Sequence, residues 1–134
     1  MSFDLGVWYS RRPLSNGEAA EIYGALAEGT DLPTDAAVEP SPVVAAFLTA
    51  LDARYPNLDA LPEDQVDESP WASGFESSER HVLLNLRWGA SDDVVLWIVR
   101  LAAEHGLVLF DPQGDEVHLP PTMPKRRSGW RFWR

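Results

Sequence analysis

The sequence predicts an α+β fold, a two-layer sandwich in which three helices cover one face of a four-stranded mixed sheet. Two segments, 3–9 and 81–88, alternate between apolar and other residues, as strands with one buried face do. Three further segments repeat apolar residues at helical spacing behind clear start signals. The predicted order is strand, helix, helix, strand, helix, strand, strand (β-α-α-β-α-β-β).

The two alternating strands each present one face to the core. In 3–9 the odd-numbered residues are apolar, and in 81–88 the even-numbered residues are apolar. If these strands are neighbours, their outward residues form one polar patch that contains an aromatic side chain. That patch consists of Asp4, Trp8, His81, Asn85 and Arg87.

Each predicted helix has a start signal and a stop signal. The start signals are a capping-box pattern at 15–18, a serine followed by proline at 41–42, and a serine at 91. The stop signals are glycines at 29 and 106 and a proline at 56. These signals lie on either side of the three apolar stripes, so the helix positions follow from local sequence.

The C-terminal part of the domain contains two short strands. The apolar run 107–110 has no room for a helix, 111–114 matches a type I turn, and 117–119 is expected to form an edge strand. Because a helix separates the strands at 81–88 and 107–110, a right-handed crossover is expected to make them parallel, with the rest of the sheet antiparallel.

The segment 56–79 has no clear period and is predicted to be a long acidic loop. Residues 52–79 hold eight acidic residues and one basic residue, a net charge of −7. Asp64, Asp67 and Glu68 could pair with lysines or arginines of a partner, with Trp71 and Phe75 as aromatic contacts.

Charge divides the 134-residue chain, whose formal net charge is −10, into two parts. Residues 1–124 hold 6 basic and 21 acidic residues, a net −15, and are predicted to form one domain. Residues 125–134 form a tail with a charge of +5 that also contains aromatic residues. The tail residues of interest are Lys125, Arg126, Arg127, Trp130 and Trp133.

The composition excludes several classes of protein. The chain has no cysteine, which removes disulfides, thiol nucleophiles and thiolate metal sites. No apolar run approaches the roughly 20 residues of a membrane span, and no secretory signal opens the chain, so a cytoplasmic location is expected. An acidic body repels phosphates, so nucleic acid is disfavoured as a partner and a basic protein is favoured.

No catalytic, metal or cofactor site is predicted. The three histidines lack metal-ligand spacing, and the chain contains neither a GxSxG elbow nor a glycine-rich nucleotide loop. The acidic pair Asp92-Asp93 is accounted for by its place in the first turn of a helix.

Three patches resemble a group of small bacterial proteins, largely uncharacterised and frequent in actinomycetes. These patches are 1–8, the Ser-Pro-Trp turn at 69–71 and 104–113, which reads Glu-His-Gly-Leu-Val-Leu-Phe-Asp-Pro-Gln. Members of the group open with Met-Ser-Tyr-Asp-Leu-x-Val-Trp and finish with a helix, a glycine, a strand and Asp-Pro-Gln. Some such small acidic proteins look like immunity partners of secreted toxins. The resemblance implies a protein-binding role and carries over no catalytic residue.

The leading hypothesis is a non-enzymatic binding protein, most concretely an immunity protein or antitoxin that occludes a basic toxin surface. One alternative is a small enzyme or ligand-binding domain with a pocket between helices and sheet, near Trp8, His81 and Arg87. Another is a nucleic-acid or membrane accessory module that acts through the tail. For the tail, folding back onto the acidic domain is favoured on Coulomb grounds. The partner and the oligomeric state do not follow from the sequence.

Overall fold

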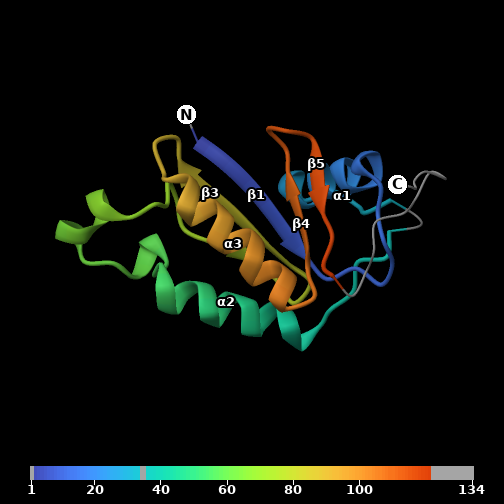
Figure 1. Cartoon of the computed structure of the whole chain (residues 1–134), viewed down its shortest axis with the longest axis horizontal. Coiled ribbons are helices and arrows are strands. Elements are labelled where there is room, and N and C mark those ends of the chain that lie inside the picture. Colours follow the sequence, from blue (N-terminus) through green and yellow to red (C-terminus); the bar gives the residue numbers. More distant parts are fainter. Residues whose placement is uncertain (1, 34–35, 122–134) are drawn as a thin grey trace.

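The computed structural model describes residues 2–33 and 36–121, which form one five-stranded antiparallel sheet with helices on both faces (Figure 1). The strand order across the sheet is β2-β3-β1-β4-β5. The strands are β1 Ser2–Trp8, β2 Glu76–Ser77, β3 His81–Arg87, β4 Val108–Asp111 and β5 Glu116–His118. The helices are α1 Asn16–Glu28, α2 Pro42–Arg54 and α3 Asp92–Glu104, with 3₁₀ turns η1 Leu58–Ala60 and η2 Glu63–Glu68.

The sheet confirms the α+β class but corrects the predicted strand pairing. β1 lies in the centre and pairs antiparallel with both β3 and β4, with Leu5 opposite Leu84 and Val7 opposite Leu109. β3 and β4 therefore run in the same direction, as the crossover predicts, but β1 lies between them. The prediction of a mixed sheet was wrong, because a crossover helix determines strand direction and leaves adjacency open, and every pairing in the sheet is antiparallel. The fifth strand, β2, has two residues, too few to show a period.

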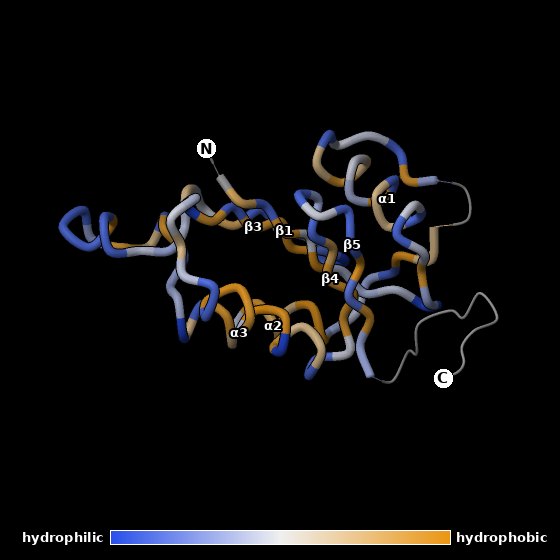
Figure 2. Tube along the Cα trace, turned by 45° about the horizontal axis from the view of Figure 1, so that its top comes forward, coloured by the Kyte–Doolittle hydropathy of each residue, from blue (hydrophilic) through white to orange (hydrophobic). Residues whose placement is uncertain are grey.

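The prediction that all three helices cover one face was also wrong. α2 and α3 pack on the face that carries Leu5, Val7 and Leu84, whereas α1 packs on the opposite face with Trp8 and Phe110. Figure 2 shows α2 and α3 together on one side of the sheet and α1 on the other. β1 and β4 are thus covered on both sides, β5 is covered on its α1 face, and the β3 side has a helix layer on one face only.

The start of α1 and its contact with the sheet explain its placement. The Ser15 hydroxyl accepts the Glu18 N–H at 3.1 Å, and the Glu18 carboxylate accepts the Ser15 N–H at 3.0 Å, so the predicted capping box is present. Gly6 of β1 faces α1, and a Cβ there would come within 2.7 Å of the Tyr23 ring. Asn16 accepts the Val117 N–H at 2.9 Å, which joins the helix start to the edge strand β5.

No helix in the described ranges is both long enough and apolar enough to span a membrane. The tail residues predicted to bind phosphates, membranes or the acidic domain (Lys125, Arg126, Arg127, Trp130 and Trp133) lie outside the described residues.

Candidate functional site

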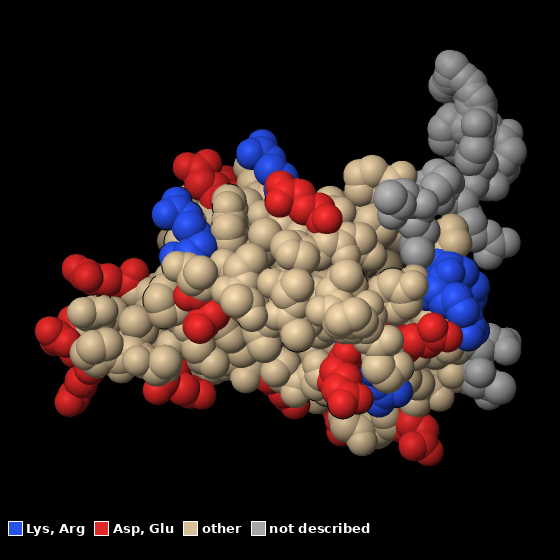
Figure 3. Space-filling model, turned by 90° about the horizontal axis from the view of Figure 1, so that it is seen from below, with Lys and Arg blue, Asp and Glu red and all other residues tan. Residues whose placement is uncertain are grey.

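Residues 56–70 form a protrusion at one end of the molecule, called the acidic lobe below. It contains both 3₁₀ turns, so the predicted loop 56–79 has short elements of its own (Figure 1). The lobe holds five acidic residues and no basic residue, and all five are exposed: Asp59, Glu63, Asp64, Asp67 and Glu68. None of these five carboxylates forms an ion pair with any residue that the structure describes. In Figure 3 acidic side chains cover the tip at the left end of the molecule.

Arg87 holds the lobe against the sheet. Its guanidinium donates to the backbone carbonyls of Val66 at 2.7 Å, Asp67 at 3.2 Å and Trp71 at 3.3 Å. The first two carbonyls lie near the end of η2, where the Val66 carbonyl also accepts the Ser69 N–H at 3.2 Å. The Arg87 N–H also donates to Pro70 at 2.8 Å. The arginine predicted to lie on an outward polar patch therefore positions the lobe, and it pairs with none of the five carboxylates.

Trp71, which was predicted to contact a partner, belongs to the core. Its side chain is fully buried, and its indole N–H donates to the Tyr55 carbonyl at 2.9 Å. The half-buried Phe75 packs edge-on against it, with ring centroids 4.9 Å apart. These aromatics fix the end of the lobe in place and leave its carboxylates exposed. The isolated bridge from Trp71 to Leu86 makes this burial possible, and no local pattern reveals that bridge.

Trp8 is also fully buried, beneath α1, so the predicted outward patch is divided. Its indole nitrogen has no hydrogen-bond partner in the described structure. Asp4 and Asn85, directly opposite one another, remain partly exposed on the same face. Of the three residues near which a pocket was predicted, Arg87 lines a hollow at the base of the lobe, whereas Trp8 and His81 line neither that hollow nor the three others described.

A groove runs along the base of the acidic lobe. Its larger part, about 550 Å³, lies between the end of the lobe and the start of α3. A smaller hollow of about 200 Å³ continues it beneath η2. The two parts share Tyr55, Glu68, Ser69 and Pro70 and are together called the lobe groove. The larger part is also lined by Asp67, Arg87, Gly89, Ala90, Ser91 and Val94, and the smaller part by Pro56, Leu61 and Gln65.

The lobe groove combines an apolar floor with an acidic rim. Tyr55, Pro70 and Val94 supply partly exposed apolar surface, while Asp67 and Glu68 are exposed carboxylates beside it. Trp88 follows directly on Arg87 in the chain and is 60% exposed. The strand pattern places Trp88 on the core face, but β3 ends at Arg87 and Trp88 lies in the turn. An exposed tryptophan next to a groove is typical of protein-binding surfaces.

A serine and a histidine lie in contact in the turn between β2 and β3. The Ser78 hydroxyl lies 2.6 Å from His81 Nδ1, and it also accepts the Arg80 N–H at 3.1 Å. Together with the Ser78 N–H to His81 carbonyl bond, these contacts close the tight turn between β2 and β3. Burial lowers the pKa of His81, which favours its neutral form.

Within residues 2–33 and 36–121, no three histidine, aspartate or glutamate side chains are grouped so that they could hold a metal ion. Comparison of the chain with family models, with curated proteins and with solved structures finds no match.

Proposed function

We propose that this protein is a non-enzymatic protein-binding domain whose acidic lobe and lobe groove engage a basic surface of another protein. Most concretely, it acts as an immunity protein or antitoxin that covers the basic surface of a toxin. The observation that carries the proposal is the set of five exposed carboxylates on a lobe held in place by Arg87, none of them paired with a cation of the described chain.

Charge and apolar contact have different roles in this proposal. An exposed ion pair contributes only about 0–1 kcal/mol, so the lobe carboxylates chiefly increase the association rate and select a basic partner. Most of the affinity then comes from burying apolar surface, which the groove floor and Trp88 supply. A complementary partner presents an apolar or aromatic side chain surrounded by lysines or arginines.

The rigidity of the lobe supports a binding role over a solubilising role. A charged segment that only keeps a protein soluble needs no fixed geometry, whereas this lobe is tied down by Arg87, Trp71 and Asn57. The Asn57 side-chain oxygen accepts the N–H groups of Asp59 at 3.2 Å and Phe75 at 3.3 Å. A preorganised surface loses less entropy when a partner binds.

The test is co-expression and co-purification with the products of adjacent open reading frames, followed by measured association rates for any protein that is retained. Reversing Asp64, Asp67 and Glu68 to lysine should lower the association rate at least 10-fold at low salt. The matched control reverses Glu21, Glu28 and Asp31, which are exposed residues outside the lobe, and gives the same change in net charge. Equal losses in the two variants would show that only net charge matters. The proposal fails if no adjacent product binds and no growth defect is rescued.

A further inference from the structure

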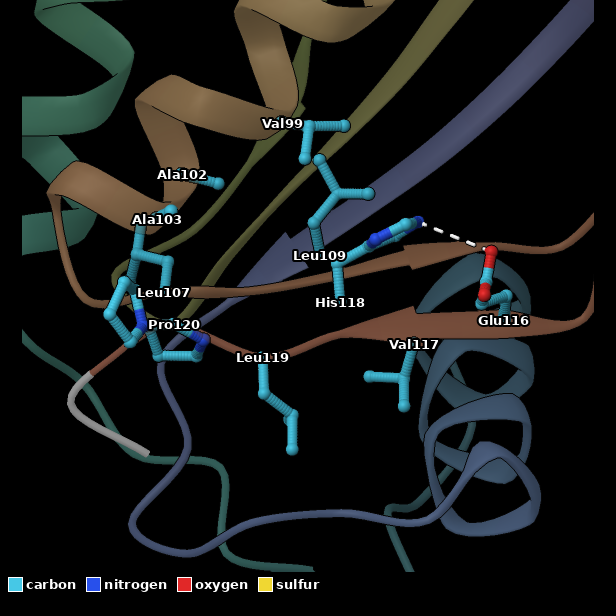
Figure 4. A pocket seen from close by; sticks show the side chains of 11 residues that line it. Val99, Ala102, Ala103, Leu107, Leu109, Glu116, Val117, His118, Leu119 and Pro120 are labelled. Carbon is cyan, nitrogen blue, oxygen red and sulfur yellow. Dashed lines mark ion pairs between the residues drawn. The ribbon is translucent and has the colours of Figure 1, made fainter. Parts of the chain in front are cut away.

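A second groove, separate from the lobe, lies between α3 and the hairpin formed by β4 and β5 (Figure 4). It is called the hairpin groove below and has a volume of about 370 Å³. Its walls are mostly apolar, with one ion pair between His118 and Glu116 at 3.6 Å. The lining residues are Val99, Ala102, Ala103, Leu107, Leu109, Glu116, Val117, His118, Leu119, Pro120 and Pro121.

The groove exists because α3 leaves part of the hairpin uncovered. β5 pairs with β4 so that His118 lies opposite Leu109, which belongs to the core on the α3 face. Val117 points to the other face and packs in the cluster beneath α1. The α3 face of β5 therefore lies beside the core with no described element over it.

We propose that the chain's own C-terminal segment, residues 122–134, binds in the hairpin groove, with the indoles of Trp130 and Trp133 against Val99, Ala103 and Leu109. The described chain ends at the groove itself, since Pro120 and Pro121 form part of its lining.

Charge and reach both favour this occupant. Residues 122–134 carry five basic residues and no acidic residue, whereas residues 100–121 carry one basic and four acidic residues. The thirteen residues 122–134 can extend over about 40 Å, which is long enough for Trp130 and Trp133 to reach the groove. Gly129, directly before Trp130, allows the chain to turn back toward the groove. Short loops close at modest entropic cost. The covalent link supplies an effective concentration on the order of 1 mM, so even a weak site is largely filled.

The experiment uses the full chain labelled with 5-fluorotryptophan, whose ¹⁹F signals are assigned by single Trp→Phe substitutions. The solvent-isotope shift of each signal between H₂O and D₂O reports how exposed that indole is. Trp8 and Trp71, both fully buried, and Trp88, 60% exposed, are internal references within the same molecule. Trp130 and Trp133 should show less than half the isotope shift of Trp88.

Ala103→Lys places a cation on the groove wall and should raise the isotope shift of both tail indoles to that of Trp88. The control is Ala53→Lys, an exposed position of α2 with the same charge change, which should leave the tail signals unchanged. If Ala103→Lys alters the Trp8 or Trp71 signals, the double variant Trp130→Ala/Trp133→Ala replaces it and should move the methyl resonances of Val99 and Leu109.

Three outcomes overturn the proposal. The first is a tail isotope shift equal to that of Trp88 in the unaltered chain, and the second is an equal response to Ala103→Lys and Ala53→Lys. The third is a tail signal that changes with protein concentration, because the segment of a second copy would then fill the groove. None of these readouts involves the acidic lobe, so the result does not depend on the proposed function.

Discussion

Replacing Arg87 with alanine removes three side-chain hydrogen bonds, two to the acidic lobe and one to Trp71, which follows it, and leaves the backbone bond to Pro70. A hydrogen bond contributes about 1 kcal/mol net, and more when the donor is charged. The carbonyl of the exposed Asp67 can bind water instead, and that of Val66 keeps the Ser69 N–H, whereas the carbonyl of Trp71 belongs to a buried residue and loses the arginine as its donor. The expected loss in the free energy of unfolding is therefore about 2 kcal/mol.

Two measurements separate the local effect from the global one. Urea denaturation gives the free energy of unfolding, and native-state hydrogen exchange of the Trp71 indole N–H, which donates to Tyr55, reports opening of the lobe. Arg87→Lys keeps the charge but replaces the planar donor fork with one ammonium, so it should lose about half as much stability. The reasoning is refuted if the lysine variant is as stable as the unaltered protein, because charge alone would then account for the role of Arg87.

Three further predictions concern the sheet and its helices. Gly6→Ala should lower the free energy of unfolding, measured in urea, by about 1–3 kcal/mol, because its methyl would lie 2.7 Å from the Tyr23 ring. The loss should be smaller in a Tyr23→Ala background. An equal loss in that background contradicts the packing explanation. Asn16→Ala should lower the free energy of unfolding by about 1 kcal/mol and speed hydrogen exchange of the Val117 N–H, because that N–H loses its acceptor. An unchanged exchange rate would rule out that contact. Because burial lowers the pKa of His81, the unfolded chain takes up a proton at a higher pH than the folded chain, so stability should fall as the pH drops below about 6.5. His81→Gln should flatten that part of the pH profile, and an identical slope in both proteins excludes His81 as the cause.

Local signals in the sequence predicted the three helices and the two longest strands, β1 and β3. Ser15 and Glu18 form the expected capping box, Ser41 and Ser91 cap the other two helices, and Gly29 ends α1 in the left-handed conformation with φ +71°. Each of these features depends on residues within one turn of each other, so it can be read from the sequence directly.

Features that depend on distant pairing were missed. Gly6 and Trp8 on the second face of β1 suggest a close approach by another element, but the sequence does not name α1 as that element. The same limit applies to the candidate site. The exposed carboxylates of the lobe follow from composition, whereas the burial of Trp71 and the hydrogen bonds of Arg87 depend on contacts across the chain.

The central position of β1 has a consequence for how the chain folds. β1 precedes the other strands of the sheet in the chain, yet its two partners, β3 and β4, begin only at residues 81 and 108. Until both have left the ribosome, β1 exposes two unpaired edges and the apolar side chains of Leu5 and Val7. The central part of the sheet therefore forms only after β4 has been synthesised, and such non-local topology folds slowly. Nascent chains that end before β4 should be prone to aggregation and dependent on chaperones.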